Sequence, residues 1–272
     1  MRDEQFRYIG KLGQSFSAAG NPVVSVDTKK KELVGRFKNQ GRSWSKTPVK
    51  VADHDFRSQA EGIAAPYGIY DVGANRGSVY VGISSDTPEF ATDCICRWYE
   101  EEGRYRYPYQ DEILILADSG GSNGYRCRAW KQGLQIKLAN CYGLKVTVCH
   151  YPPGCSKWNP IDHRLFSEIS KNWQGRPLDS YQTILNYIST TTTATGLKVR
   201  ACLNASHYTK GKRITDGEMA ALSLKPHDIQ PERNYTIIPN AAGSRTSNHS
   251  LDWWARNIGD KQPAMAKSGS YF

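Results

Sequence analysis

Apolar residues along the chain fall into short runs, and the spacing of these runs predicts alternating strands and helices. Five runs are β-branched and mostly apolar and therefore predict strands: 22–27, 67–72, 78–83, 112–118 and 144–150. The turn-forming residues between the second and third runs predict a hairpin. The fourth run is apolar along nearly its whole length, which is typical of a strand covered on both faces.

Helical patterns separate the later strands. Thr87 and Pro88 form a helix start, with Thr87 as the N-cap and Pro88 at the first helical position. Helices are expected over 1–20, 88–102, 128–141, 160–173 and 178–191. Strands joined through helices favour parallel pairing, so the chain is expected to fold as one mixed five-stranded α/β sheet flanked by helices. The pattern weakens beyond residue 190, and we expect one domain over 1–238 and an irregular C-terminal tail over 239–272.

Two predicted strands end in an acid, Asp27 and Asp118. Burying a carboxylate is costly unless it is paired or bound to metal, and ligands of α/β sheets bind beyond the carboxyl ends of the strands. Oxygen ligands of this kind suit Mg²⁺ or Mn²⁺, and two such ions could support phosphoryl transfer. The alternative is that each Asp only caps the turn that follows it.

A third acidic ligand should come from the helix after the last predicted strand. Asp162 lies near the start of that helix, where the helix dipole also stabilises an acid without any metal. Glu168 is the rival ligand on the same helix, although it points to a different face. Asp71, on the predicted hairpin, is a weaker candidate that could equally be a turn acid.

The charge of the chain points to a polyanionic partner. The net charge is +10, and residues 29–50 contain eight Lys or Arg and one acid, with Phe37 and Trp44 interleaved. Basic and aromatic residues together suit nucleic-acid binding, although a solvated basic surface is equally compatible with them. The candidate DNA contacts are Lys29, Lys30, Lys31, Arg36, Lys38, Arg42, Asn123, Lys157 and His163.

Several sequence features bear on location. No apolar run reaches the roughly 20 residues that a membrane-spanning helix needs, and the first ten residues do not have the pattern of a signal peptide. The seven scattered cysteines lack the spacing of a zinc site. We expect a cytoplasmic, nucleoid-associated protein with no membrane partner.

Longer blocks carry a specific resemblance. VSVDTKKKELVG at 24–35, PYGIYDV at 66–72, LADSGGSNG at 116–124, TVCHYPPG at 147–154 and KWNPIDHRLF at 157–166 resemble the ISAzo-thirteen family of insertion-sequence transposases, and weaker matches follow at 191–197 and 234–237. The resemblance implies a ribonuclease H-like catalytic domain of the DDE superfamily. It also implies two Mg²⁺ ions, or Mn²⁺, DNA cutting at transposon ends and attack of the freed 3′-hydroxyl on target DNA. A homodimer is compatible with this activity.

In this resemblance Asp27 and Asp118 fall on the first two acids of the family. The third is usually Glu in an Asn-Pro-Ile-Glu-His motif, and here it is Asp162, one methylene shorter. The family usually carries a helix-turn-helix region before the catalytic domain, and this chain begins almost at the catalytic domain. Two alternatives therefore stand beside the active transposase: a truncated, catalytically weak DNA-binding remnant, and a nuclease or resolvase on the same fold.

Overall fold

The computed structural model describes residues 2–240, and the expected tail over 239–272 lies almost wholly outside them. The strands are β1 (Val23–Thr28), β2 (Glu32–Val34), β3 (Gly62–Asp71), β4 (Arg76–Gly82), β5 (Glu112–Ala117), β6 (Lys145–His150), β7 (Lys198–Asn204), β8 (Leu224–Pro226) and β9 (Asn234–Ile237). The α-helices are α1 (Arg2–Ala18), α2 (Pro88–Trp98), α3 (Arg104–Arg106), α4 (Arg128–Gly133), α5 (Ser167–Asn172), α6 (Tyr181–Ser189) and α7 (Asp216–Ala220).

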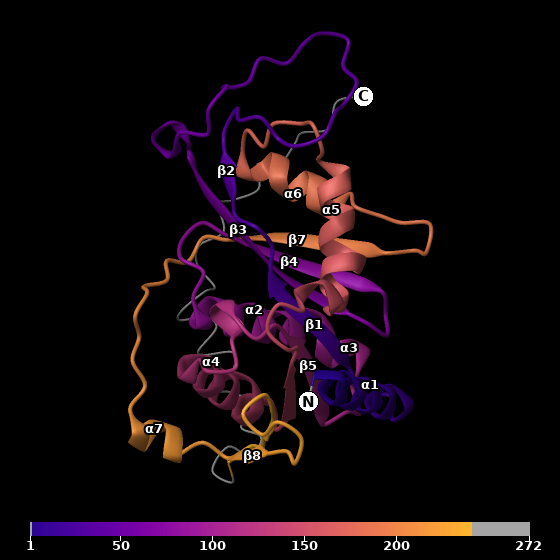
Figure 1. Cartoon of the computed structure of the whole chain (residues 1–272), viewed down its shortest axis with the longest axis vertical. Coiled ribbons are helices and arrows are strands. Elements are labelled where there is room, and N and C mark those ends of the chain that lie inside the picture. The colour runs from indigo at the N-terminus through magenta and orange to yellow at the C-terminus, as the bar shows by residue number, and fades with distance from the viewer. Residues whose placement is uncertain (1, 241–272) are drawn as a thin grey trace, which may run out of the picture.

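The described part of the chain forms one mixed sheet of nine strands (Figure 1). Their order is β7-β4-β3-β1-β5-β6-β9-β8, and β2 pairs with β3. Strands β1, β5 and β6 run parallel to one another, whereas β3 is antiparallel to both β1 and β4. These five strands are the ones expected from the sequence, so the mixed α/β sheet flanked by helices is confirmed.

The remaining four strands were not predicted. Strand β7 pairs in parallel with β4, β9 and β8 extend the sheet beyond β6, and β2 adds to β3. Strands β2 and β8 have only three residues each, and β7 alternates between exposed and half-buried positions. Edge strands of this kind bury little apolar surface, so their hydrophobic signal is weak.

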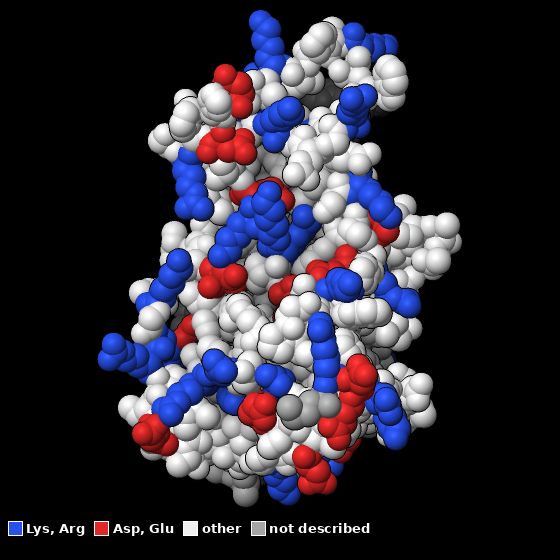
Figure 2. Space-filling model, viewed as in Figure 1, with Lys and Arg blue, Asp and Glu red and all other residues white. Residues whose placement is uncertain are grey.

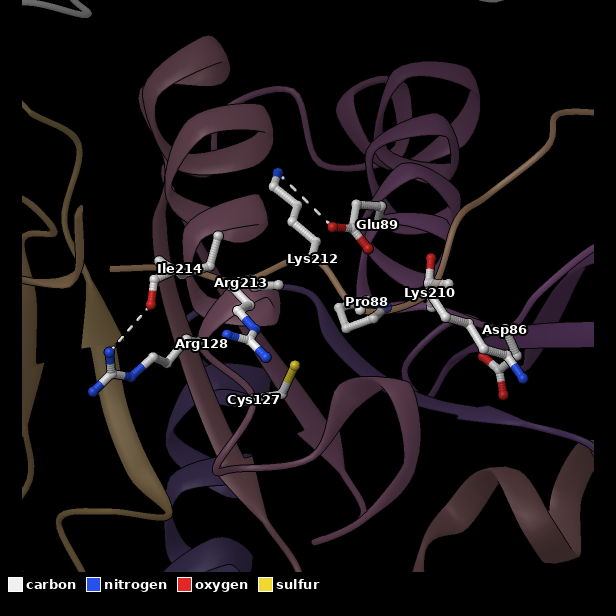
Figure 3. A pocket seen from close by; sticks show the side chains of 12 residues that line it. Asp86, Pro88, Glu89, Cys127, Arg128, Lys210, Lys212, Arg213 and Ile214 are labelled. Atoms are coloured by element: carbon white, nitrogen blue, oxygen red, sulfur yellow. Dashed lines mark hydrogen bonds and ion pairs between the residues drawn. The ribbon is translucent and has the colours of Figure 1, made fainter. Parts of the chain in front are cut away.

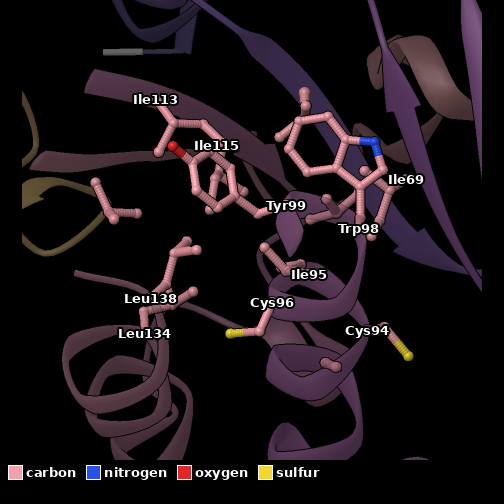
Figure 4. Close-up of a cluster of buried hydrophobic side chains, with 14 of the residues drawn as sticks. Ile69, Cys94, Ile95, Cys96, Trp98, Tyr99, Ile113, Ile115, Leu134 and Leu138 are labelled. Carbon is pink, nitrogen blue, oxygen red and sulfur yellow. The ribbon is translucent and has the colours of Figure 1, made fainter. Parts of the chain in front are cut away.

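Helices cover both faces of the sheet. The side of α2 and α4 holds the largest apolar cluster, where Ile95, Leu134 and Leu138 pack with Ile113 and Ile115 of β5 (Figure 4). On the opposite side, α1 packs against β1 and β5, whereas α5 and α6 pack against β3 and β4 (Figure 1). Because successive side chains of a strand point to opposite faces, β1, β3, β4, β5 and β6 contribute apolar side chains to both faces.

Local sequence explains where the main helices begin. The Thr87 hydroxyl accepts a hydrogen bond from the Phe90 N–H, as predicted, and Ser180 caps α6 through the Thr183 N–H. Three of the predicted helices contain π-helical turns, at Tyr99–Gly103, Leu134–Asn140 and Asp162–Phe166. No helix among the described residues has the length and hydropathy needed to cross a lipid bilayer.

Candidate active site

Asp27 and Asp118 lie side by side at the carboxyl ends of two parallel neighbouring strands. In the pairing of β1 with β5, Val26 stands opposite Ala117, so the residues that follow them occupy adjacent positions. Val26 and Ala117 belong to the apolar cluster on the α2 face. Strand alternation therefore directs both carboxylates to the opposite face, on the side of α5.

The electrostatics of the two acids reflect this proximity. Burial, followed by the charge of Asp118, raises the pKa of Asp27 from 3.8 to about 8. Burial also raises the pKa of Asp118 to about 6, against a hydrogen bond from Asn159 that lowers it. Like charges disfavour joint ionisation, so the pair carries about one proton at neutral pH.

Asp162 is the third acid of this group. It begins the π-helical turn that leads into α5, and its charge contributes to the raised pKa of both Asp27 and Asp118. Burial raises the pKa of Asp162 itself, whereas His163 and Lys29 lower it. Short π-helical insertions occur often at functional sites.

Glu168, the rival third ligand, lies six residues further along. Its carboxylate is paired with Lys171 Nζ at 2.7 Å, and it does not contribute to the pKa shifts of the two strand acids. The structure therefore brings Asp162, and not Glu168, into electrostatic contact with the other two acids.

A buried polar network that the sequence did not predict holds the Asp118 carboxylate and joins β1 to the segment before Asp162. Asn159 Nδ2 donates to Asp118 Oδ1 at 3.1 Å and to the Val26 carbonyl at 3.4 Å. Asn159 Oδ1 accepts a hydrogen bond from the Ser25 hydroxyl, which in turn accepts one from the Ile161 N–H at 3.0 Å. Both Asn159 and Ser25 are fully buried. A polar residue in an otherwise apolar strand, Ser25 in β1, is the only local signal that could have indicated this network.

His150 holds the main chain beneath Asp118. Burial lowers the pKa of this imidazole to about 4, so it is neutral at physiological pH. Its Nδ1 lies 2.9 Å from the Asp118 carbonyl, and its Nε2 lies 3.2 Å from the Tyr235 hydroxyl. A carbonyl can only accept, so Nδ1 carries the proton and Nε2 accepts from Tyr235. His150 is therefore a support of the site and not a free acid or base.

The donor set suits a divalent cation in its chemistry. Three carboxylates converge on one side of the sheet, and Asn123 Oδ1, buried beside β1, has no hydrogen-bond partner among the described residues. Asn123 Nδ2 reaches the Val26 carbonyl at 3.5 Å. As the described side chains stand, no group of three His, Cys, Asp or Glu residues is placed to hold a metal ion. The types of ligand atom therefore suit a divalent metal ion, whereas the spacing of the side chains does not.

Lys29 takes a different position from the one expected of a DNA contact. It is 9% exposed, its Nζ lies 3.6 Å from Glu32 Oε1, and it stands over the Trp173 ring at 4.7 Å. Burial lowers the pKa of Lys29. Lys29 thus lies inside the protein beside Asp162, where its charge acts on the acid.

The other predicted basic contacts are exposed. Lys31 Nζ lies 3.5 Å from Asp86, and Lys157 stands over the Trp158 ring at 5.6 Å. The exposed group also includes Lys30, Arg36, Lys38, Arg42 and His163. Figure 2 shows Lys and Arg side chains gathered near the middle of one face, with acidic side chains beside them.

The basic segment after β2 is tied to the end of α5. Gly175 N–H donates to the Gln40 carbonyl at 2.7 Å, and the Ser43 hydroxyl donates to the Gly175 carbonyl at 3.0 Å. Trp44 at the tip of this segment is 98% exposed. The basic residues of this segment and Trp44 are therefore exposed, whereas Phe37, the other interleaved aromatic residue, is buried.

Asp71 has a structural role. Its fully buried carboxylate accepts hydrogen bonds from Arg106 Nη1 at 2.8 Å, from the Tyr107 hydroxyl at 2.9 Å and from the Ala74 N–H at 3.1 Å. Its partner in the pairing of β3 with β1 is Val24, three positions before Asp27. The turn-acid interpretation of Asp71 therefore fits better than the ligand interpretation.

One known protein family matches almost the whole described part of the chain. Residues 1–239 match the family model described as Rhodopirellula transposase DDE domain. A search among curated protein sequences finds no match to the chain.

Among solved structures, the chain is similar to a Mos1 transposase paired-end complex with left transposon end, at 16% identity and a TM-score of 0.41, over 61% of this chain and 46% of that chain. It is also similar to the Mos1 Strand Transfer Complex, at 15% identity and a TM-score of 0.44, over 68% of this chain and 50% of that chain. The chain spans about half the length of these structures.

Proposed function

The chain belongs to the transposase DDE-domain family, and from this premise we propose that it cuts DNA at the ends of an insertion sequence and joins the freed 3′-hydroxyl to target DNA. The membership bears out the resemblance read from the sequence blocks. The observation that supports the activity most is the pair of acids at the ends of β1 and β5. Their raised pKa values are typical of functional sites.

We propose that Asp27, Asp118 and Asp162 hold divalent cations, either Mg²⁺ or Mn²⁺, in two positions. Carboxylate oxygens are the ligands that these cations prefer. Bound there, two ions would activate the attacking oxygen and stabilise the leaving oxygen during phosphoryl transfer.

The residues around the acids have supporting roles in this proposal. Asn159 orients the Asp118 carboxylate through its 3.1 Å hydrogen bond, and neutral His150 fixes the main chain of Asp118. Asn123, with its unpartnered Oδ1, is available to a ligand of the site. Exposed cations bind the DNA backbone: Lys30, Lys31, Arg36, Lys38, Arg42, Lys157 and, when protonated, His163.

The partners follow from this activity. Transposon ends and target DNA are the substrates, and a homodimer would bring two ends together. We place the protein in the cytoplasm, at the nucleoid where its DNA lies. Buried Lys29 is assigned to the support of Asp162 and not to direct DNA contact.

A nicking assay tests the activity without knowledge of the end sequence. We expect the purified chain to nick supercoiled plasmid with Mn²⁺ or Mg²⁺, and Asp27→Ala or Asp118→Ala to abolish nicking. Asp55→Asn, at an exposed acid, is the matched control and should retain it. Absence of metal-dependent nicking by the wild-type chain would refute the enzyme assignment. A preference for RNA–DNA hybrids or four-way junctions would favour a nuclease or resolvase instead.

A DNA-binding remnant is the second candidate function. It is favoured by the spacing of the acids, since no three are placed to hold a metal ion among residues 2–240. Asp162→Glu separates the candidates because the longer side chain reaches further toward the other two acids. A large gain in nicking would identify side-chain length as the limit. Salt-sensitive DNA binding that survives Asp27→Ala, without nicking by either protein, would establish the remnant.

A further inference from the structure

A pocket lies close to the proposed catalytic acids, and Asp86 stands between the pocket and these acids. It has a volume of about 490 Å³ and is lined by the start of α2, the start of α4 and part of the irregular segment 205–215, called here the strap. The strap connects β7 to α7 and runs along the outside of the molecule (Figure 1). Figure 3 shows Lys212 and Arg213 of the strap between the ribbons of α2 and α4.

Asp86 connects this pocket to the proposed active site. It is one of the lining residues, and its Oδ1 accepts a hydrogen bond from the Thr28 hydroxyl at 3.2 Å. Thr28 directly follows Asp27 in β1. The charge of Asp86 also contributes to the raised pKa of Asp27, so the pocket borders the end of β1 that carries this acid.

Some of the charged residues that line the pocket form ion pairs, and others do not. Both lining acids have a lysine partner, since Asp86 lies 3.5 Å from Lys31 and Glu89 lies 3.8 Å from Lys212. Arg128 is also paired, at 2.6 Å from Asp216.

Two lining cations remain uncompensated. Lys210 and Arg213 are exposed strap residues that make no ion pair and no side-chain hydrogen bond with the described residues. In Figure 3 these two side chains point to different parts of the pocket, so each is suited to a different phosphate, and Arg can bind one through two parallel hydrogen bonds.

The other lining residues indicate which part of DNA enters. No aromatic side chain lines the pocket, so it offers no surface on which a base could stack. The uncharged residues there are small or aliphatic, such as Pro88, Ala129 and Ile214. Contacts of this composition position the sugar-phosphate backbone and do not read bases.

We propose that this pocket is a DNA phosphate site, in which Lys210 and Arg213 each bind a backbone phosphate of the strand that passes the catalytic acids. The proposal rests on the proposed function for the identity of the ligand. It adds a contact from the strap, about 180 residues beyond the lysines that follow β1.

Salt-dependent DNA binding tests the site without requiring catalysis. The probe is a labelled duplex of about 30 base pairs, titrated without divalent metal between about 50 and 200 mM KCl and followed by fluorescence anisotropy. Each lost phosphate contact lowers the slope of log K against log salt by about 0.9, so Lys210→Ala/Arg213→Ala should lower it by about 1.8. Affinity near 0.1 M salt should fall on the order of tenfold or more.

The matched control removes two charges elsewhere. Arg7→Ala/Lys11→Ala changes two exposed residues of α1 and should leave the slope unchanged, and Lys210→Arg should keep the wild-type slope. If the pocket variant changes the slope no more than the α1 variant does, the phosphate site is refuted.

The same variants separate the two proposals. If nicking requires Asp27 and the slope of the pocket variant is unchanged, the phosphate site is refuted and the transposase proposal stands. If the slope of the pocket variant is reduced and the wild-type chain does not nick DNA, the transposase proposal is refuted and the phosphate site stands. A wild-type chain that neither binds nor nicks DNA would overturn both.

Discussion

Replacing Asp27 by Asn should make the folded protein more stable at neutral pH. Burial and the charge of Asp118 raise the pKa of Asp27 from 3.8 to about 8 in the folded state. An acid with a raised pKa binds more protons when folded than when unfolded, so stability falls as pH rises between the two values. Asn has nearly the same shape and does not ionise, so it removes this loss.

The expected gain in unfolding free energy follows from the number of pH units between the unfolded pKa of Asp27 and neutral pH. Each of these pH units costs about 1.4 kcal/mol of unfolding free energy. From 3.8 to neutral pH is about three units, so ionisation of Asp27 costs on the order of 4 kcal/mol. Hydration and relaxation of a partly buried carboxylate reduce the cost, so we expect Asp27→Asn to gain ~2–4 kcal/mol near neutral pH. Near pH 4 the gain should almost vanish, because Asp27 is then protonated in the folded protein and about half protonated in the unfolded chain as well.

Urea unfolding followed by tryptophan fluorescence measures this difference. The wild type, Asp27→Asn and the exposed control Asp55→Asn would be compared at about pH 5, 6 and 7.5 without divalent metal. We expect the gain of Asp27→Asn to increase across the series and the control to show none. A variant no more stable than wild type at the highest pH would refute the buried, charge-coupled description of Asp27.

Three further substitutions test the surroundings of the acids. Asn159→Ala should lower nicking about tenfold and the unfolding free energy by ~1–3 kcal/mol in urea, because it leaves buried polar groups unpaired. Gly68→Ala should cost ~1–3 kcal/mol and lower nicking, since its Cβ would stand 2.6 Å from the Phe166 ring on the segment that carries the third acid. Arg106→Ala should lower the melting temperature, at a cost of about 3 kcal/mol, because it leaves the fully buried Asp71 carboxylate without its cation.

The strands of the site could be predicted because their signals are local. Strands β1 and β5 are apolar runs that end in an acid, and the start of α2 is marked by Thr87 and Pro88. The added strands have no such signal. Strand β7 is held by parallel pairing with β4, about 120 residues earlier in the chain, so its formation depends on a contact that no local pattern reports.

The same limit applies to the site residues. Asp27 and Asp118 could be recognised from their own strands, but their support comes from Asn159, which is 134 residues from its partner Ser25. Lys29 was predicted to contact DNA as one of the three lysines that follow Asp27. It is buried because Trp173, distant in sequence, forms the surface over which it lies. Both findings depend on how α5 and the turn before it dock onto the sheet.

From the Asn159 network we expect the length of the side chain at Asp162, the proposed third acid, to limit its reach toward the other two. Both hydrogens of Asn159 Nδ2 are used, its Oδ1 accepts from Ser25, and Ser25 accepts from the Ile161 N–H. The Asp162 N–H in turn donates to the Asn159 carbonyl at 3.1 Å. A buried network in which every donor and acceptor is paired resists rearrangement, because any shift leaves a polar group unpaired. The main chain at Asp162 is therefore fixed relative to the two strand acids, and the reach of its carboxylate is set by the side chain alone.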